Sequence, residues 1–281
     1  MLKFRELAEK FLIWSAVHRP GRTTEWYKNY ISMFLAWPGV ADTPADQIRP
    51  YQVQEWIDSH GDAWGDNYRG GAVIAIKRIY HWADELGYME ANPIKKLKKP
   101  PPQRRKSYMK PEDFDAILHN LEENDPFRDL LTFAWNTGAR PQEIRAIEHR
   151  HLNIEKGYIL FPKEEAKGKR HPRKILLNGI ALQIIKRLME KNVDGKIFRN
   201  SRNDEWTKYA LCNRMHRLSE VTGKKLCMYD ARHGYATRKL KAKHGHLEIA
   251  ATMGHTDGSM IAKVYSHIDE DDEHLRKVLI D

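Results

Sequence analysis

The stretch KKLKKPPPQRRKSYMK, residues 95–110, divides the sequence into two parts of different character. It holds eight lysine and arginine residues, no acidic residue and three consecutive prolines. Because proline lacks a backbone donor and restricts the chain, we expect an extended, stiff connector rather than a packed element. The stretch therefore predicts two domains, one on each side.

The part before the connector, residues 1–94, predicts helices only. Apolar residues recur at helical spacing on a first helix, and Thr24 is a candidate cap for a second. A short helix is expected over Asp46–Ile57, and a longer one ends at Gly87. The many aromatic residues fall on the apolar faces of these helices, so we interpret them as core rather than as a platform for stacking bases.

The part after the connector, residues 108–281, predicts a mixed domain in which helices surround a small sheet. Apolar stripes and the Pro and Gly signals that flank them place the element boundaries. The expected elements are helices beginning near Pro111, Phe127, Pro141, Gly179 and Trp206, and a hairpin of two strands, Tyr158–Phe161 and Lys174–Leu177. The predicted fold class is mainly α with a small β-sheet.

Charge indicates the class of partner. The chain has 48 Lys and Arg against 38 Asp and Glu, a formal net charge of +10, which favours a polyanion such as nucleic acid or an anionic membrane surface. No apolar run is long enough to span a membrane, and Glu6 and Glu9 interrupt the first apolar segment, unlike a signal peptide. Two cysteines are too few for a disulfide framework. We expect a cytoplasmic protein that does not bind membranes.

Two kinds of cofactor site are missing from the sequence. It contains no G-x-x-x-x-G-K-[ST] loop for a nucleoside triphosphate and no compact metal-ligand motif among its 14 histidines. Cys212 and His216 stand four residues apart, which is weak evidence for a metal site. We therefore predict neither a cofactor nor a metal. A nucleic-acid enzyme that lacks both would have to neutralise phosphate with side-chain cations and cut the strand with a nucleophile of its own.

Five short blocks carry suitable chemistry in chain order. They are TGARPQEI with Arg140 and Glu143, AKGKRHPRK with Lys167, YDARHGYATR with Arg232 and His233, MGH with His255, and KVYSHI with Tyr265. In sequence and spacing these blocks resemble the tyrosine recombinase, or phage integrase, family, and the similarity covers essentially the whole chain. The resemblance implies an N-terminal helical, SAM-like core-binding domain at residues 1–94, a linker at 95–107, and a mixed α+β catalytic domain at 108–281.

The resemblance also implies a mechanism. Tyr265 would attack a DNA phosphodiester, leaving a 3'-phosphotyrosyl enzyme and a free 5'-hydroxyl, so that neither ATP nor a metal is needed. Arg140 and Arg232 would bind the non-bridging oxygens, and His255 would hydrogen-bond the phosphate. Lys167 would protonate the leaving oxygen. Glu143 would brace neighbouring polar groups.

The sequence departs from the family pattern at two places. Tyr229 occupies the position, three residues before Arg232, where the family usually has histidine, so it would orient the phosphate while another group or water acts as base. Tyr265 stands ten residues after His255, one more than the commonest spacing. His233 matches a histidine common in the family and is expected to support the helix. The alternative for the two arginines is structural ion pairing with nearby carboxylates.

The expected partner is double-stranded DNA, held partly by the connector cations Lys98, Lys99, Arg104, Arg105 and Lys106. A tail with an acidic run before Leu275 predicts a helix that docks on a neighbouring protomer, or alternatively on its own domain. The family implies a homotetramer on two duplexes, a monomer or weak dimer when free, and association with the nucleoid. Because helices are expected almost from Met1, we expect no arm-binding domain ahead of the core-binding one.

The predicted function is site-specific recombination that integrates or excises a mobile element. A topoisomerase IB-like enzyme that relaxes DNA is an alternative within the same chemistry, because it needs the same nucleophile but no pairing of sites. A DNA-binding protein that has lost catalysis is a second alternative. In that case Tyr229 and the altered spacing before Tyr265 would be signs of decay.

Overall fold

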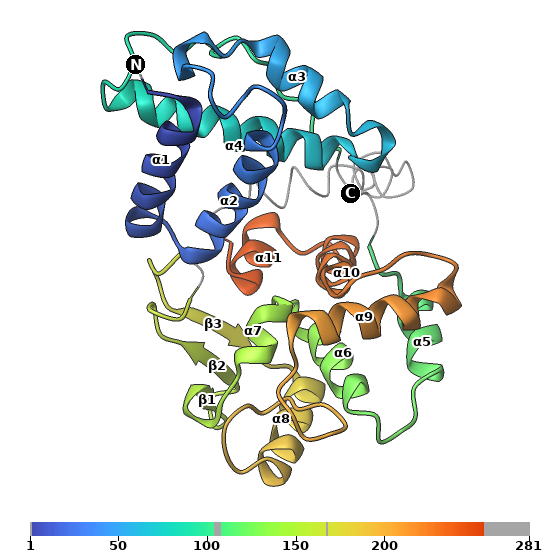
Figure 1. The fold of residues 1–281 in the computed structure, drawn as a ribbon. Helices are drawn as coiled ribbons and strands as arrows, with labels where there is room; N and C mark the ends of the chain where they lie inside the picture. Colours follow the sequence, from blue (N-terminus) through green and yellow to red (C-terminus); the bar gives the residue numbers. More distant parts are fainter. Residues whose placement is uncertain (1, 104–107, 167, 256–281) are drawn as a thin grey trace, which may run out of the picture. The chain divides into compact units, whose positions relative to one another are not determined.

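The computed structural model describes residues 2–103, 108–166 and 168–255 (Figure 1). The chain separates into two compact units, Met1–Arg105 and Lys106–Asp281. Among the described residues, the first unit contains helices only, and the second combines helices with one small sheet. This agrees with the predicted fold class, mainly α with a small β-sheet.

The first unit is built around a long helix. Its helices are α1 (Phe4–His18), α2 (Gly21–Leu35), α3 (Pro50–Asp58) and α4 (Asp66–Glu85), with 3-10 turns at Ala45–Gln47 and Gly61–Ala63. The helices α1, α2 and α3 all pack against α4. Large aromatic side chains fill the space between them, including the fully buried Phe34, Trp56 and Tyr80. Their burial accounts for much of the apolar contribution to the stability of this unit.

Two predicted boundaries in the first unit are wrong. Helix α2 begins at Gly21, so Thr24 lies inside its first turn, where its hydroxyl donates to the Ser15 carbonyl at 3.0 Å instead of capping. The helix expected over Asp46–Ile57 is interrupted, and α3 begins only at Pro50. Proline has no N–H to donate and its fixed φ suits the first helical position, so a new helix starts there.

The first part of the basic connector packs against α4, so the expectation of an unpacked connector is wrong up to Gln103. Leu97 is buried, and Lys77 on α4 donates to its carbonyl at 2.8 Å. The Asn67 side chain donates to the Gln103 carbonyl at 2.8 Å and accepts from its N–H at 3.1 Å. A proline-rich segment cannot pair with itself, so these side chains of α4 satisfy its backbone.

The second unit is organised around α6. Up to residue 255, its elements are α5 (Pro111–His119), α6 (Pro126–Thr137), α7 (Pro141–Ala146), β1 (Leu152–Asn153), β2 (Tyr158–Phe161), β3 (Arg173–Leu176), α8 (Gly179–Lys191), α9 (Lys208–Ser219), α10 (Met228–Lys241) and α11 (His246–Met253). Helix α6 packs between α8 and α10 (Figure 1). Its buried residues recur at helical spacing, as the sequence predicts. Gly138, which follows the last helical residue, caps α6 in the left-handed conformation.

The sheet has the strand order β1-β2-β3, and both pairs are antiparallel. The predicted hairpin is confirmed, with Ile159 opposite Ile175 and Phe161 opposite Arg173. Strand β3 begins one residue earlier than expected, so Arg173 belongs to it. The strand β1 was not predicted because two residues carry no alternation that could be recognised.

Helix α10 lies very close to α6 because a glycine faces its neighbour. A Cβ added at Gly234 would lie 2.3 Å from the Met109 carbonyl oxygen and 2.5 Å from the Trp135 ring. On another side of α10, Ala236 and Leu240 pack with residues of α11 in a separate small apolar cluster. These two contacts fix α10 between α6 and α11, which positions the arginine that α10 carries.

Candidate active site

Arg232 lies at the point where three segments of the second unit meet. It is on α10 and is only 3% exposed. Its Nη1 donates to the carbonyl of Gly138, just beyond α6, and its Nη2 donates to the Met253 carbonyl of α11 at 2.8 Å. The same Nη2 lies 2.8 Å from Nε2 of His255. The structure therefore brings together Arg232 and His255, which the sequence places 23 residues apart.

Arg140 approaches the same turn from the start of α7. Its Nη2 donates to the Gly254 carbonyl at 3.1 Å, and its Nη1 donates to Oε1 of Glu143 at 2.7 Å. The Arg140 backbone N–H donates to the other carboxylate oxygen at 2.9 Å. Glu143 thus holds Arg140 by both its side chain and its main chain. The ion pair expected as a structural alternative is present, and the same guanidinium also reaches the residue next to His255.

Sequence reasoning missed Arg173, which joins this cluster from β3. It is 7% exposed, its Nε lies 3.4 Å from Oε1 of Glu143, and its Nη1 donates to the Thr252 carbonyl at 3.0 Å. Its Nη2 is buried and makes no hydrogen bond to any described residue. The missed signal was the strand alternation, because Arg173 shares the buried face of β3 with Ile175.

The carboxylate of Glu143 stays ionised in this cluster. Burial raises its pKa, but the positive charge of Arg173 and the hydrogen bonds and charge of Arg140 outweigh that effect, so the pKa is lowered below the usual value. One carboxylate therefore faces the guanidinium groups of Arg140 and Arg173, with Arg232 close by. Among the described residues of the cluster the positive charge is in excess. Such a set of planar donors suits an anion with oxygens in several directions, such as a phosphodiester.

The other predicted site residues are not all in this cluster. Tyr229 lies on α10 and is 44% exposed. His233 is partly buried, and burial lowers its pKa, with the charge of Arg232 adding to the shift against the influence of Asp230. Lys98 and Lys99 are exposed residues of the first unit. Outside the described residues lie Lys167, Tyr265, Arg104, Arg105, Lys106 and the tail from residue 256.

The described part of the chain contains no group of three or more His, Cys, Asp or Glu side chains that could hold a metal ion. Within the same residues, no helix is long and apolar enough to cross a membrane. Cys212 and Cys227 form no disulfide.

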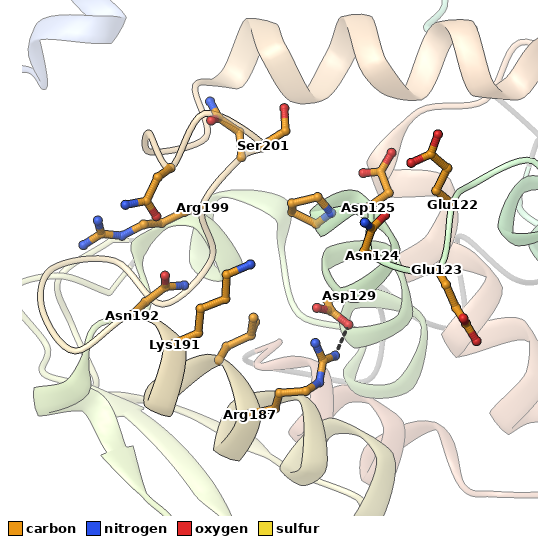
Figure 2. Close-up of a pocket in the computed structure, with 14 residues that line it drawn as sticks. Glu122, Glu123, Asn124, Asp125, Asp129, Arg187, Lys191, Asn192, Arg199 and Ser201 are labelled. Carbon is orange, nitrogen blue, oxygen red and sulfur yellow. Dashed lines mark hydrogen bonds and ion pairs between the residues drawn. The ribbon is translucent and has the colours of Figure 1, made fainter.

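A hollow of about 590 Å³ lies elsewhere in the second unit (Figure 2). Its acidic wall comes from the segment before α6 and from α6 itself, and its cations come from α8 and the loop after it. Arg187 of α8 pairs with Asp129 of α6 at 2.5 Å across the hollow. None of the clustered arginines lines it, and opposite charges already face each other there. The arginine cluster is the better candidate for phosphate chemistry.

Residues 107–272 of the chain match the phage integrase family. The chain belongs to the phage integrase family. The family and the enzyme class predicted from the five sequence blocks are therefore confirmed. This integrase is an enzyme of site-specific DNA recombination, a tyrosine recombinase that breaks and rejoins DNA strands.

Curated relatives of this integrase include the tyrosine recombinase XerD of Chlorobaculum tepidum. It is 23% identical over 290 residues, which cover 95% of this chain and 93% of the relative. The tyrosine recombinase XerC of Escherichia coli strain K12 / DH10B is 23% identical over 233 residues, covering 73% and 70% of the two chains. These alignments extend beyond the residues that match the family.

Solved structures of integrases share the fold of this one. The Tn1549 transposon integrase in complex with transposon right end DNA aligns with a TM-score of 0.77 and 15% identity, covering 99% of this chain and 100% of that chain. A lambda integrase tetramer bound to a Holliday junction aligns with a TM-score of 0.79 and 14% identity, covering 94% and 77%.

Proposed function

We propose that this integrase cleaves and rejoins DNA through a 3'-phosphotyrosyl intermediate with Tyr265 as the nucleophile, without metal or ATP. The observation that carries the proposal is the convergence of Arg140, Arg232 and His255 on the turn at Gly254. Side chains from three segments face one small region, which suits a single phosphorus centre. Tyr265 follows this turn by eleven residues in the sequence.

Each side chain has a defined part in the first step. The Tyr265 oxygen forms a bond to phosphorus while the bond to the 5'-oxygen breaks, and the proton that this oxygen needs comes from Lys167. Arg140 and Arg232 stabilise the charge that develops on the non-bridging oxygens. Arg140 has five N–H donors, and the described side-chain contacts use two of them, so it retains donors for phosphate. His255 donates to the same phosphate, and reversal of the step rejoins the strand.

Tyr229 is assigned the orientation of the phosphate rather than proton removal. A phenol has a pKa of about 10, so it is a poor proton acceptor from another phenol. Tyr229 lies one helical turn before Arg232 on α10 and is partly exposed, a position that suits contact with DNA. The proton of the nucleophile then passes to another group or to water.

The proposed organisation on DNA assigns residues 1–94 to core-site binding, 95–107 to the linker and 108–281 to catalysis. The exposed cations Lys98 and Lys99 contact the DNA backbone, as do Arg104, Arg105 and Lys106 in the same connector. Two relatives described above were solved on DNA, one as a tetramer on a Holliday junction. By analogy, four copies pair two duplexes here and integrate or excise a mobile element in the cytoplasm, at the nucleoid.

A nicked suicide substrate tests the chemistry. The recombination site is first recovered by sequencing the joined ends of the element in its host, and a duplex of that sequence is nicked close to the cleavage point. The wild type should form a covalent protein–DNA adduct on a denaturing gel, in EDTA and without ATP, and Tyr265→Phe should form none. Tyr209→Phe, which alters an exposed tyrosine of α9, should form the adduct normally.

The same experiment separates the alternatives. Tight binding without any adduct would overturn the proposal in favour of a binding protein that has lost catalysis. Strand cleavage that leaves no adduct and is abolished by EDTA would indicate a metal nuclease instead. Relaxation of a supercoiled plasmid without exchange between two sites, together with a normal adduct, would favour the topoisomerase-like alternative.

A further inference from the structure

Arg173 is buried although most charged residues around it in the sequence are not. Lys169, Arg170 and Lys174 are exposed, whereas Arg173 is 7% exposed. Removing a guanidinium from water is unfavourable unless it is paired and hydrogen-bonded. The strand alternation places Arg173 inward beside Ile175, so β3 carries a buried cation at this position.

The contacts of Arg173 link three segments of the candidate site. Its Nε lies 3.4 Å from Glu143 Oε1, the oxygen that also accepts from Arg140, and its Nη1 donates to the Thr252 carbonyl at 3.0 Å. A Cβ added to Gly254 would lie 2.7 Å from three atoms of the guanidinium. Glycine is therefore needed for the guanidinium to lie against the turn that precedes His255.

Arg173 also stands at the base of the loop that carries Lys167. It is the register partner of Phe161, and this is the last pair of the β2–β3 ladder before residues 162–172. Lys167 lies in that loop by sequence. A side chain fixed at the base of a hairpin restricts the positions that its loop can reach.

Stability alone does not account for this arginine. Its Nη2 is buried and makes no hydrogen bond to any residue that the structure describes. Buried donors are nearly always satisfied in folded proteins, and a neutral or apolar side chain would avoid the penalty. Arg173 is therefore explained by a role in the candidate active site rather than by its contribution to the stability of the fold.

We propose that Arg173 is a positioning residue that holds the Lys167 hairpin against the Arg140–Glu143 pair and the Gly254 turn. It acts on the reaction through Lys167, which protonates the leaving 5'-oxygen, and so the inference rests on the function proposed above. Removing Arg173 leaves the phosphate-binding groups Arg140 and Arg232 in place but lets the hairpin move. The defect then falls on protonation of the leaving group.

The test compares two suicide substrates that differ at the leaving atom. One carries the normal 5'-oxygen and the other a 5'-bridging sulfur, whose thiolate leaves without a proton because a thiol has a pKa of about 8.5. Lys167→Ala should lose roughly 10²-fold or more in cleavage of the oxygen substrate, the usual size of general acid catalysis, and recover on sulfur. Arg173→Gln should show the same pattern, with a loss of about 10-fold or more on oxygen and near wild-type cleavage on sulfur.

Two controls define the range of the assay. Arg140→Ala should be slow on both substrates, because it removes charge stabilisation that either leaving group needs. Arg170→Gln removes an exposed cation from the same loop and should cleave both substrates normally. Arg173→Lys keeps the charge but cannot reach Glu143 and Thr252 together, so it should show a smaller oxygen-specific defect. This variant serves if Arg173→Gln fails a thermal melting check.

The outcomes are distinct. Equal loss on both substrates by folded Arg173 variants would overturn the inference and assign Arg173 to phosphate binding or general support. Normal cleavage of the oxygen substrate would overturn it as well. If Lys167→Ala itself is not rescued by sulfur, the proposed role of Lys167 fails. If Lys167→Ala is rescued and the Arg173 variants are not, only the inference fails.

Discussion

Replacing Gly138 with alanine tests how the end of α6 positions Arg232. Gly138 has φ 62° and ψ 15°, and its carbonyl accepts from Nη1 of Arg232. The ring of Tyr235 lies against it, so that an added Cβ would be 2.6 Å from Tyr235 Cδ1. Alanine at this position is therefore unfavourable for two reasons. Its backbone would have to adopt the left-handed conformation, and its Cβ would clash with the buried Tyr235 ring.

The expected loss of stability follows from these two terms. An L-residue in the left-handed region costs about 1–2 kcal/mol. Overpacking against a buried ring costs about 1–3 kcal/mol more. The sum of about 2–5 kcal/mol is a large part of the ~5–15 kcal/mol that stabilises a typical domain.

Gly223 offers a matched control. Its backbone is nearly the same, with φ 64° and ψ 11°, but an added Cβ would have nothing within 4 Å. Gly223→Ala should therefore show only the backbone term of about 1–2 kcal/mol. Urea unfolding of both variants gives the difference, which measures the contact with Tyr235.

The same variants should separate in activity. Gly138→Ala displaces the carbonyl that holds Arg232, so adduct formation on the suicide substrate should fall, whereas Gly223→Ala should cleave normally. Equal free energies of unfolding for the two variants would refute the argument from Tyr235. Normal cleavage by a folded Gly138→Ala protein would refute the link to Arg232.

The pKa of Glu143 is lowered from 4.5, so the stability contributed by its ionised carboxylate is present above that pH and is lost as the pH falls through the lower pKa of the folded state. Glu143→Gln should therefore weaken the dependence of the free energy of unfolding on pH in this acidic range, as measured by urea unfolding at several pH values. An unchanged pH dependence would contradict this role of Glu143. Asn67→Ala removes both hydrogen bonds to Gln103, so it should lower the free energy of unfolding by about 1 kcal/mol. It should also speed proteolysis near Gln103. An unchanged cleavage rate would mean that other contacts hold the connector. Arg238→Met removes a guanidinium that lies 3.7 Å from the Trp135 ring centroid, together with its hydrogen bond to the Trp135 carbonyl. Thermal melting should show a loss of about 1–3 kcal/mol in the free energy of unfolding. A wild-type melting temperature would exclude this stacking as a source of stability.

Local signals were sufficient for much of the fold. The apolar stripe of α6 and the glycine that follows it predicted both the helix and its end at Gly138. Pro111 and Pro141 likewise occupy first helical positions. These features are encoded within a few neighbouring residues, so a reading of the sequence can find them.

Other features depend on partners far away in the sequence. The connector was expected to be unpacked because the amide of Asn67, which pairs with Gln103, stands 36 residues earlier. Arg173 was hidden in a basic run, because only the strand register and the presence of Glu143, 30 residues away, select it for burial. The alternation along β3 is a local signal for Arg173, but its distant partners leave no mark in the neighbouring sequence.

Main-chain oxygens supply two of the hydrogen bonds of Arg232, from Gly138 and Met253. Every residue type presents such an oxygen, so the side chain at position 253 can change during evolution without removing an acceptor from this arginine. An insertion or deletion in either segment would instead shift the acceptor itself. At position 253, therefore, a change of side chain leaves the acceptor present, whereas a change of chain length displaces it.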